Sequence, residues 1–304
     1  MQQPGKKNLY IGVSLAVMAT IIWSVNFVIA RGISSKVPPL SLNFFRWASA
    51  SALIFPFAFK SFLAEKELVF KHWKYFFAVS FSCILLFNSM VYIAGHHTTA
   101  INLALVGTTS SPIFTIILSA IFLKEAIRPL RILGLLICIT GILYLLSQGS
   151  FQHLLAFRFS RGDWWILSGA FFFALYTILV KRRPEGISSL VFLFVFILLG
   201  AGMLLPLYIW EYQHAAPIAW NGQLRGVILY LGLGTSIIAY LCWNAAILRI
   251  GSSRTGLFGN LMPLFSAFEA LLVLNEKIQT VHIISGILVI TGLIIANLRN
   301  ASMA

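Results

Sequence analysis

Charged side chains are scarce in this 304-residue chain, at 10% of its residues, and acidic ones are the scarcest, with 8 Asp and Glu against 22 Lys and Arg. A soluble protein normally carries about 25% charged residues. With 59% hydrophobic residues and so few charges, the chain cannot cover its surface against water. This composition excludes an ordinary soluble fold, and we expect an integral membrane protein.

Sequence motifs of the common enzyme classes are also missing. The chain has no His-Glu-x-x-His, no Gly-x-Ser-x-Gly, no phosphate-binding loop and no cluster of carboxylates near a membrane face. Its three cysteines, Cys83, Cys138 and Cys242, lie in apolar segments without the spacing of a metal site or the external position of a disulfide. No lysine lies deep in an apolar segment, so a retinal Schiff base is not expected. We therefore predict no enzyme activity and no cofactor.

The excess of basic residues gives a formal net charge of +14, which could suggest a nucleic-acid partner. The basic residues lie, however, in short connectors between apolar runs. Anionic lipid headgroups attract basic residues at such positions. We predict membrane lipid, and no nucleic acid, as the partner of these charges.

Apolar runs of about 20 residues, the length that spans a bilayer, occur ten times. They lie near residues 9–30, 40–59, 74–95, 100–122, 130–147, 164–181, 188–210, 225–247, 255–274 and 280–298. The first run is longer than the core of a signal peptide and lacks a cleavage site of small residues, so we expect it to be retained. The predicted fold class is all-α, with ten transmembrane helices and both chain ends on one side.

The orientation follows from the basic residues, because Lys and Arg are retained on the cytoplasmic side during insertion. One side of the predicted topology holds 15 of them: Lys6, Lys7, Lys60, Lys66, Lys71, Lys74, Lys124, Arg128, Arg131, Lys181, Arg182, Arg183, Arg249, Arg254 and Arg299. The other side holds six: Arg31, Lys36, Arg158, Arg161, Arg225 and Lys277. We predict that both termini are cytoplasmic and that the membrane is a bacterial inner membrane.

The second half of the chain repeats features of the first at a constant offset of 151 residues. Leu123-Lys124-Glu125, preceded by Pro112, returns as Leu274-Asn275-Glu276, preceded by Pro263. The predicted halves are residues 1–148 and 149–304. Because each half crosses the membrane five times, the second enters from the opposite face, and the repeats are inverted. Such halves enclose the substrate path of many transporters.

Several motifs resemble the EamA family of the drug/metabolite transporter superfamily. They are Trp23-Ser24-Val25-Asn26-Phe27, Leu42-Asn43-Phe44-Phe45-Arg46 and Pro112 with Leu123-Lys124-Glu125, followed in the second copy by Pro263, Leu274-Asn275-Glu276 and Gly292. The resemblance implies a ten-helix carrier without a bound cofactor, often an exporter of amino acids or related metabolites. The chain departs from the pattern in its second half, where Phe173-Ala174-Leu175-Tyr176 replaces the first motif and Arg46 has no counterpart.

Three functions remain open at this stage. The first is export of amino acids by alternating access, driven by a substrate gradient or by proton exchange. The second is uptake or exchange of a nucleotide-like metabolite such as S-adenosylmethionine, and the third is a channel that does not alternate. The sequence also leaves the oligomeric state open.

Arg46 and Glu269 are the only charged residues well inside predicted spans. From the rise of a helix they lie roughly 5 and 6 Å from the middle of their segments, toward the outer face. A charge at such a depth costs about 2.5 to 3.5 kcal/mol, so each needs a partner or water. One hypothesis is that they pair across the cavity and that a zwitterionic substrate competes for them. Alternatively, Arg46 holds two helices together, and Glu269 is a proton carrier, an amine contact or part of a structural ion pair.

Other polar and aromatic residues fall into layers beside these charges. We predict substrate-binding roles for Trp23, Asn26, Asn43, Asn88 and Tyr92 on the outer side and for Tyr176, Trp243 and Asn260 on the inner side, where Tyr240 and Asn244 also lie. His96 and His97 are expected in solvent at the outer end of the third span. Pro112 and Pro263 leave the carbonyls of Thr108 and Gly259 without helical donors, which bends the helix or opens a binding spot. Gly134, Gly141, Gly286 and Gly292 are expected to let spans five and ten pack closely.

Overall fold

The computed structural model describes residues 6–33, 36–98, 100–155, 160–274 and 279–297, and within these residues the regular structure is helical throughout. The helices of the first half are α1 (Lys6–Gly32), α2 (Pro39–Lys71), α3 (Trp73–Ser80), η1 (Phe81–Asn88), α4 (Ser89–His97), α5 (Ala100–Leu123), α6 (Pro129–Leu146) and α7 (Phe151–Leu155). Those of the second half are α8 (Arg161–Lys181), α9 (Ser189–His214), α10 (Gly222–Tyr230), η2 (Leu231–Ile238), α11 (Ala239–Ile250), α12 (Ser252–Leu257), η3 (Phe258–Leu261), α13 (Met262–Leu274) and α14 (Thr280–Asn297).

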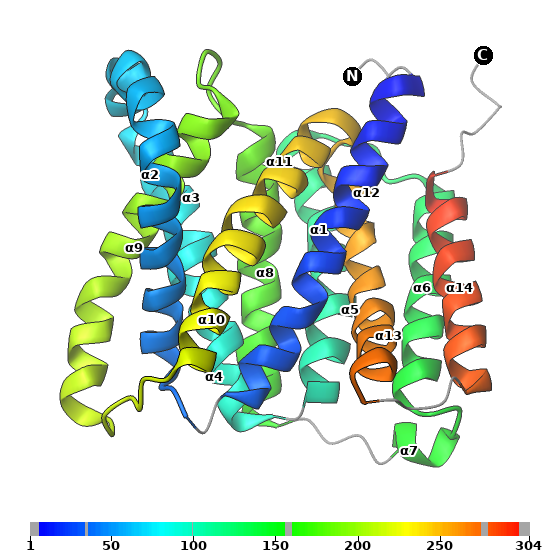
Figure 1. Cartoon of the computed structure of the whole chain (residues 1–304). Coiled ribbons are helices and arrows are strands. Elements are labelled where there is room, and N and C mark those ends of the chain that lie inside the picture. Colours follow the sequence, from blue (N-terminus) through cyan, green and yellow to red (C-terminus); the bar gives the residue numbers. More distant parts are fainter. Residues whose placement is uncertain (1–5, 34–35, 99, 156–159, 275–278, 298–304) are drawn as a thin grey trace.

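All ten predicted spans contain a described helix, and together they form one bundle (Figure 1). Eight described helices are long and apolar enough to cross a membrane, and α6 is a shorter apolar helix. The ninth predicted span is divided into α12, η3 and α13. The start of α1 and the end of α14 lie at the same end of the bundle, which we call the terminal end, and we call the other the distal end (Figure 1).

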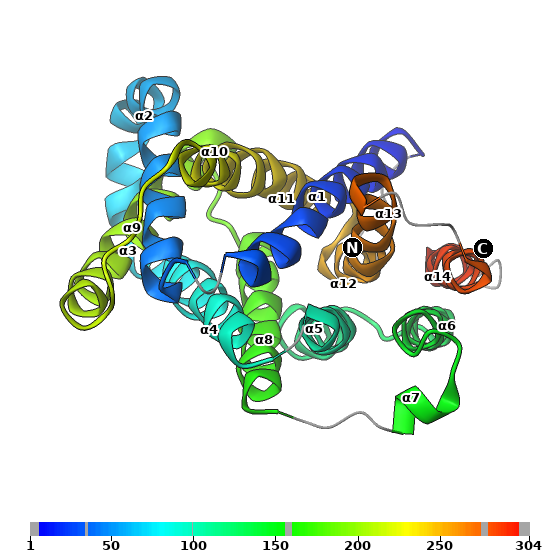
Figure 2. The same ribbon diagram turned by 60° about the horizontal axis from the view of Figure 1, so that its bottom comes forward.

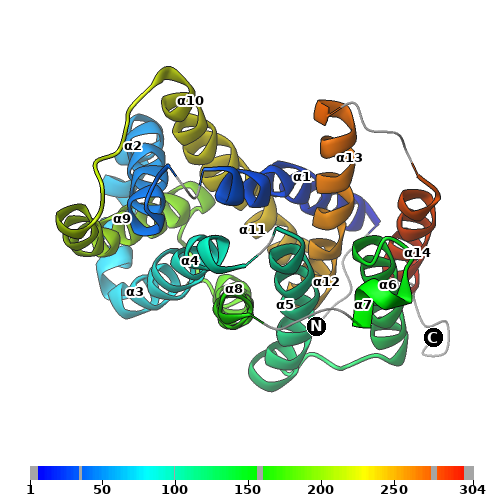
Figure 3. The same ribbon diagram turned by 90° about the horizontal axis from the view of Figure 1, so that it is seen from below.

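The two halves run in opposite directions. The first helix of the first half, α1, runs from the terminal to the distal end, whereas α8, the first of the second half, runs the other way (Figure 1). Packing follows the same relation, because α1 packs on α11 and α13 while α8 packs on α4 and α5. The equivalent helices α2 and α9 pack on each other, as do α6 and α14 (Figures 2 and 3). The predicted inverted arrangement of helices is therefore present.

A π-helical segment interrupts the third span of each half. The segments η1 and η2 are each 8 residues long and begin 150 residues apart. A π-helix is rare and is frequent at functional sites, because it changes the hydrogen-bond pattern of the backbone. The repeat is thus preserved in an unusual backbone conformation that the sequence comparison did not reveal.

The two proline positions differ. The helix α5 runs through Pro112 without a break, whereas the chain before Pro263 changes to the 3₁₀ helix η3. One residue, Gly251, separates α11 from α12, with a φ of 88° that favours glycine. The equivalent fourth and ninth spans therefore differ in backbone form.

The predicted second span was too short. Its helix α2 continues past the predicted end at residue 59 to Lys71 and, with α3, projects beyond the bundle at the terminal end (Figure 1). Hydropathy places the end of a span where charge begins, but the added residues 60–71 contain Ala, Leu, Glu and Lys, which favour helix in water as well. There, Glu65 accepts a hydrogen bond of 2.9 Å from the backbone N–H of Ser188, at the start of α9.

Helices α6 and α14 are in backbone contact through glycine. A Cβ placed on Gly292 would lie 2.6 Å from the carbonyl oxygen of Gly134 and 2.7 Å from the Sγ of Cys138, and one on Gly141 would lie 2.9 Å from Leu288 Cβ. The prediction of close packing between spans five and ten is confirmed at these glycines. It was wrong for Gly286, where a Cβ would meet no atom within 4 Å.

The α6–α14 contact can be tested with two alanine substitutions in one helix. We expect Gly292→Ala to destabilise the protein by about 1–3 kcal/mol, because the added methyl group overpacks the contact. Gly286→Ala is the matched control and should cost nothing, since it gains the helix propensity of alanine in open space. Thermal unfolding of the purified proteins in detergent measures both, and equal melting temperatures would contradict the contact.

Candidate functional site

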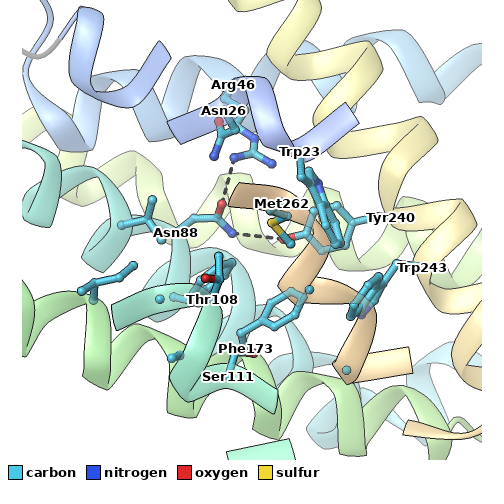
Figure 4. Close-up of a pocket in the computed structure, with 17 residues that line it drawn as sticks. Trp23, Asn26, Arg46, Asn88, Thr108, Ser111, Phe173, Tyr240, Trp243 and Met262 are labelled. Atoms are coloured by element: carbon cyan, nitrogen blue, oxygen red, sulfur yellow. Dashed lines mark hydrogen bonds between the residues drawn. The ribbon is translucent and has the colours of Figure 1, made fainter. Parts of the chain in front are cut away.

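A central cavity lies between the two halves of the bundle, and the helices of both halves line it (Figure 4). Most of its wall is apolar or aromatic, with a few polar groups. The lining residues are Trp23, Asn26, Arg46, Phe87, Asn88, Val91, Gly107, Thr108, Ser111, Ile166, Ala170, Phe173, Tyr240, Trp243, Gly256, Gly259 and Met262. Concave sites that combine apolar walls with a few placed polar groups are typical of small-molecule binding.

The positive charge of the cavity comes from Arg46 on α2, which is 1% exposed. Its Nε donates to the hydroxyl of Ser236 at 2.7 Å, and its Nη1 donates to Asn88 Oδ1 at 2.9 Å and to the Tyr92 hydroxyl at 3.1 Å. Its Nη2 donates to the carbonyl of Thr235 at 3.3 Å. Every one of these partners is neutral, so the guanidinium is solvated by dipoles and keeps its net charge.

Both π-helical segments supply partners to Arg46. Thr235 and Ser236 belong to η2, and Asn88 is the last residue of η1. Asn88 in turn donates to the carbonyl of Cys83 at 2.8 Å and to the hydroxyl of Tyr240 at 3.3 Å (Figure 4). The π-helical segments therefore direct backbone and side-chain oxygens toward the charge of Arg46. In a regular α-helix those carbonyls would accept the hydrogen bonds of the helix itself.

Four aromatic rings form one wall of the cavity. The ring centroid of Trp23 lies 5.1 Å from that of Tyr240 and 5.2 Å from that of Trp243, and Phe173 lies 5.7 Å from Trp243 (Figure 4). The indole N–H of Trp23 donates to the carbonyl of Thr235 at 2.8 Å. The indole nitrogen of Trp243 is buried and has no hydrogen-bond partner. Its N–H is therefore a buried donor without a partner, on a residue that lines the cavity.

The predicted site residues divide into two groups. Trp23, Asn26, Arg46, Asn88 and Trp243 line the cavity. Asn43, Tyr92, Tyr176, Asn260 and Glu269 are outside its lining, so their binding roles stay predictions.

The residues outside the lining have other partners. Tyr92 donates to Asn26 Oδ1 at 3.2 Å and so supports the polar side of the cavity. Asn43 is fully buried and donates to the carbonyl of Ile84 and to Ser89. Tyr176 donates to Asn244.

Asn260 and the histidine pair are placed less centrally. Asn260 donates to the carbonyl of Leu257, inside the 3₁₀ turn of its own span. The side chains of His96 and His97 are exposed at the end of α4, as expected.

Glu269 lies where α13 packs on α1. Its Oε1 is 2.5 Å from the hydroxyl oxygen of Ser24, and its Oε2 is buried without a hydrogen-bond partner. The hypothesis of an ion pair between Arg46 and Glu269 was wrong for this conformation, because each has other partners.

Two buried acidic residues of the described chain, Glu211 and Asp163, satisfy helix starts. Glu211 on α9 accepts the backbone N–H groups of Leu40 and Ser41 at 3.1 and 2.6 Å, at the start of α2. Asp163 accepts the N–H of Ser160 in the capping box of α8. A carboxylate in these places satisfies N–H groups that lack helical partners and interacts with the positive end of the helix. Glu269 caps no described helix start in this way.

Contacts between the halves join α5, the connector after it and α12 at the terminal end of the bundle. Glu125, in the repeated Leu-Lys-Glu motif, accepts hydrogen bonds from the hydroxyls of Ser252 and Ser253 and lies 3.8 Å from Arg131. One turn before the end of α5, Ser119 bonds Ser252 at 3.0 Å. We call this group the terminal lock. A second hollow borders it and is lined by Lys124, Arg128, Arg131, Lys181, Arg249 and Arg254 together with Glu125.

Sequence reasoning missed the residues that hold Arg46 and those that form the lock. Thr235 and Ser236 follow Gly232 and Gly234, and two glycines in one apolar span were a signal for irregular backbone. Ser252 and Ser253 follow Gly251, and a glycine at the end of an apolar run was a signal for a turn. Glu125 was noticed as part of the repeat but was not assigned a contact.

An inverted-repeat bundle around a central cavity is the architecture of many membrane transporters. The chain belongs to the EamA-like transporter family, whose model matches residues 10–147 and 160–298. The chain is thus a multi-pass membrane protein of a transporter family. A solved structure entitled "Crystal structure of protein" has a similar fold, with a TM-score of 0.75 and 19% identity over 96% of both chains.

Several curated relatives are named as transporters. An "Uncharacterized transporter" of Archaeoglobus fulgidus is 26% identical over 91% of this chain and 94% of its own length. "Uncharacterized transporter YyaM" of Bacillus subtilis is 28% identical over 69% of this chain and 68% of its own. A "Probable terminal-alkyne amino-acid exporter" of Streptantibioticus cattleyicolor is 26% identical over 62% and 61%.

The terminal lock can be tested with a cysteine at Thr115, which packs against Gly256 just inside it. Glu125→Ala removes two hydrogen bonds to a charged group, each about 1.5 kcal/mol or more. In the Glu125→Ala variant we expect the Thr115→Cys side chain to react at least about tenfold faster than in the protein that keeps Glu125, with a water-soluble maleimide added at the terminal side. The three native cysteines are replaced by alanine in this background. Glu185→Ala, which removes an exposed acid, is the control, and equal rates in both variants would contradict the lock.

Proposed function

We propose that this protein exports amino acids or similar small zwitterions across the cytoplasmic membrane of a bacterium by alternating access. The observation that carries the proposal is the buried charge of Arg46. Within the described residues no carboxylate contacts it. A cavity that holds one uncompensated cation favours a substrate that brings an anionic group.

Arg46 has capacity left for such a group. A guanidinium has five N–H donors, and the hydrogen bonds to Ser236, Asn88, Tyr92 and Thr235 use four of them. Hydrogen bonds to a charged group contribute about 1.5–3 kcal/mol each, which offsets the cost of about 2.5 to 3.5 kcal/mol for a charge at this depth. The existing network therefore keeps Arg46 in place, and the remaining donor is available to a carboxylate.

The rest of the cavity suits the other parts of a small amphipathic molecule. The faces of Trp23, Tyr240 and Trp243 offer apolar surface and attract an ammonium group. Asn26 and the Trp243 indole add an acceptor and a donor. The name of the Streptantibioticus relative, a probable amino-acid exporter, points in the same direction.

The terminal lock supports a carrier rather than a channel. A carrier requires that one end of the path be closed while the other is accessible, and the contact of Glu125 with Ser252 and Ser253, which joins the halves at the terminal end, supports closure there. We propose that this end is cytoplasmic, because basic residues line its hollow and dominate its connectors.

The substrate class can be tested on the unmodified protein in liposomes. We expect saturable counterflow of an apolar amino acid and at least about tenfold weaker competition by the corresponding amine, which lacks the carboxylate that Arg46 would bind. Arg46→Gln should remove this preference. Equal competition by acid and amine would contradict the role of Arg46, stronger competition by S-adenosylmethionine would favour a nucleotide-like substrate, and flux that never saturates would favour a channel.

The contribution of the Trp243 indole N–H to substrate binding can be distinguished from that of its aromatic ring. Trp243→Phe keeps an aromatic wall and removes one hydrogen bond worth about 0.5–1.5 kcal/mol, so we expect the half-saturating substrate concentration to rise roughly 2- to 10-fold. Trp47→Phe is the matched control, because its indole nitrogen is also buried without a partner but the residue does not line the cavity. An equal rise in both variants would show that the effect is one of packing.

A further inference from the structure

We infer that Glu269 and Ser24 form a proton-binding site that couples proton entry to substrate export. The inference rests on the proposed function and adds its energy source. It starts from the hydrogen bonds of one hydroxyl group, at the contact of α13 with α1.

The Ser24 hydroxyl has two close oxygen neighbours and only one proton. Its Oγ lies 2.6 Å from the carbonyl oxygen of Ile21 and 2.5 Å from Glu269 Oε1. A carbonyl oxygen can only accept, so Ser24 donates to Ile21 and must accept from Glu269 if both bonds are made. A carboxyl group donates only when it is protonated. Both bonds are made together only when Glu269 is protonated, and we therefore assign Glu269 the neutral form in this conformation.

The surroundings of Glu269 agree with a neutral carboxyl. Its second oxygen, Oε2, is buried without a partner, and a carboxylate oxygen left in that state is costly. Within the described residues no Lys or Arg side chain pairs with it, in contrast to Glu125, which has Arg131. Glu269 also caps no helix. A site without a compensating charge favours the form that carries its own proton.

Few other titratable groups belong to the helices around this site. On α1, Lys7 and Tyr10 are at the terminal end, several turns before Ser24, and Arg31 lies about two turns beyond it. His282 is near the start of α14, and α5 and η3 carry no titratable residue. Tyr230 of α10 reaches the same stretch of α1 and donates to the carbonyl of Ile22 at 2.9 Å.

The site and the substrate cavity share one helix. Trp23 lines the cavity, and the next residue, Ser24, is the partner of Glu269. The contact has a second bond, because the hydroxyl of Ser266 on α13 donates to the carbonyl of Ser24 at 2.8 Å. When Glu269 loses its proton, it can no longer donate to Ser24, and the hydroxyl must turn from Ile21 to the carboxylate. Protonation therefore biases how α13 holds the helix that carries Trp23.

The direction of coupling follows from the conformation. The terminal lock is closed while the geometry of Glu269 is that of the protonated form. If the terminal end is cytoplasmic, a proton taken from outside stabilises the closed lock, and its release into the cytoplasm accompanies opening. The proton then moves inward on the return step and the substrate moves outward on the other, which is an exchange.

The test uses the complete protein in liposomes, with an apolar amino acid as substrate and the membrane potential held at zero. A pH difference of one unit should drive about a tenfold substrate gradient if one proton exchanges for one substrate. We expect Glu269→Gln, which mimics the neutral carboxyl, to keep substrate counterflow and to lose both this gradient and substrate-driven proton movement. Glu185→Gln, at an exposed acid, should behave like the unmodified protein.

The outcomes separate this inference from the proposed function. A Glu269→Gln protein that still builds the gradient would overturn the proton site and leave the carrier function intact. A folded variant that loses counterflow as well would also overturn it, since Glu269 would then act in the substrate step. A gradient that follows Na⁺ instead of pH would overturn it too. Absence of counterflow in the unmodified protein would overturn the proposed function and the inference together.

Discussion

The arrangement of the bundle's centre depends on keeping one guanidinium charged without a carboxylate beside it. Arg46 lies between the halves, and its partners come from both of them: Asn88 from η1 and Ser236 from η2. Solvation by dipoles satisfies the geometry of the donors but leaves the charge uncancelled. The π-helical segments supply part of this solvation, which gives a physical reason for a costly backbone form at equivalent places in two halves whose sequences have diverged. In the proposed function, the same charge selects a substrate with an anionic group.

The acidic residues of this protein have different roles, which depend on where along and around a helix each one lies. Buried acids such as Glu211 and Asp163 satisfy the starts of helices, where backbone N–H groups lack partners. Glu125 joins the two halves at the terminal end. Glu269 differs from these in having a single hydroxyl as its partner. Among the residues that the structure describes, the buried acids Glu211 and Asp163 thus both have architectural roles, in a chain with only 8 acidic residues.

The fold class and the span order could be predicted from the sequence, because about twenty apolar residues in a row leave few alternatives in lipid. The depth of each residue in the membrane could also be predicted from its position along the span. On this basis Arg46 was expected at the level of other polar residues, and it contacts two of them, Asn88 and Tyr92. The pairing of Arg46 with Glu269 failed because equal depth says nothing about rotation around the helix axis, and Glu269 faces Ser24 instead. The π-helical segments depend on tertiary partners and left only weak traces, such as Gly232 and Gly234, in the sequence.

The single-residue turn at Gly251 has a mechanical consequence. It joins α11, which carries Trp243, directly to α12, whose first residues are Ser252 and Ser253. A linker of one residue limits how far one of these helices can move without displacing the other. The aromatic wall of the cavity and the serines of the terminal lock therefore lie on two successive helices that no loop separates.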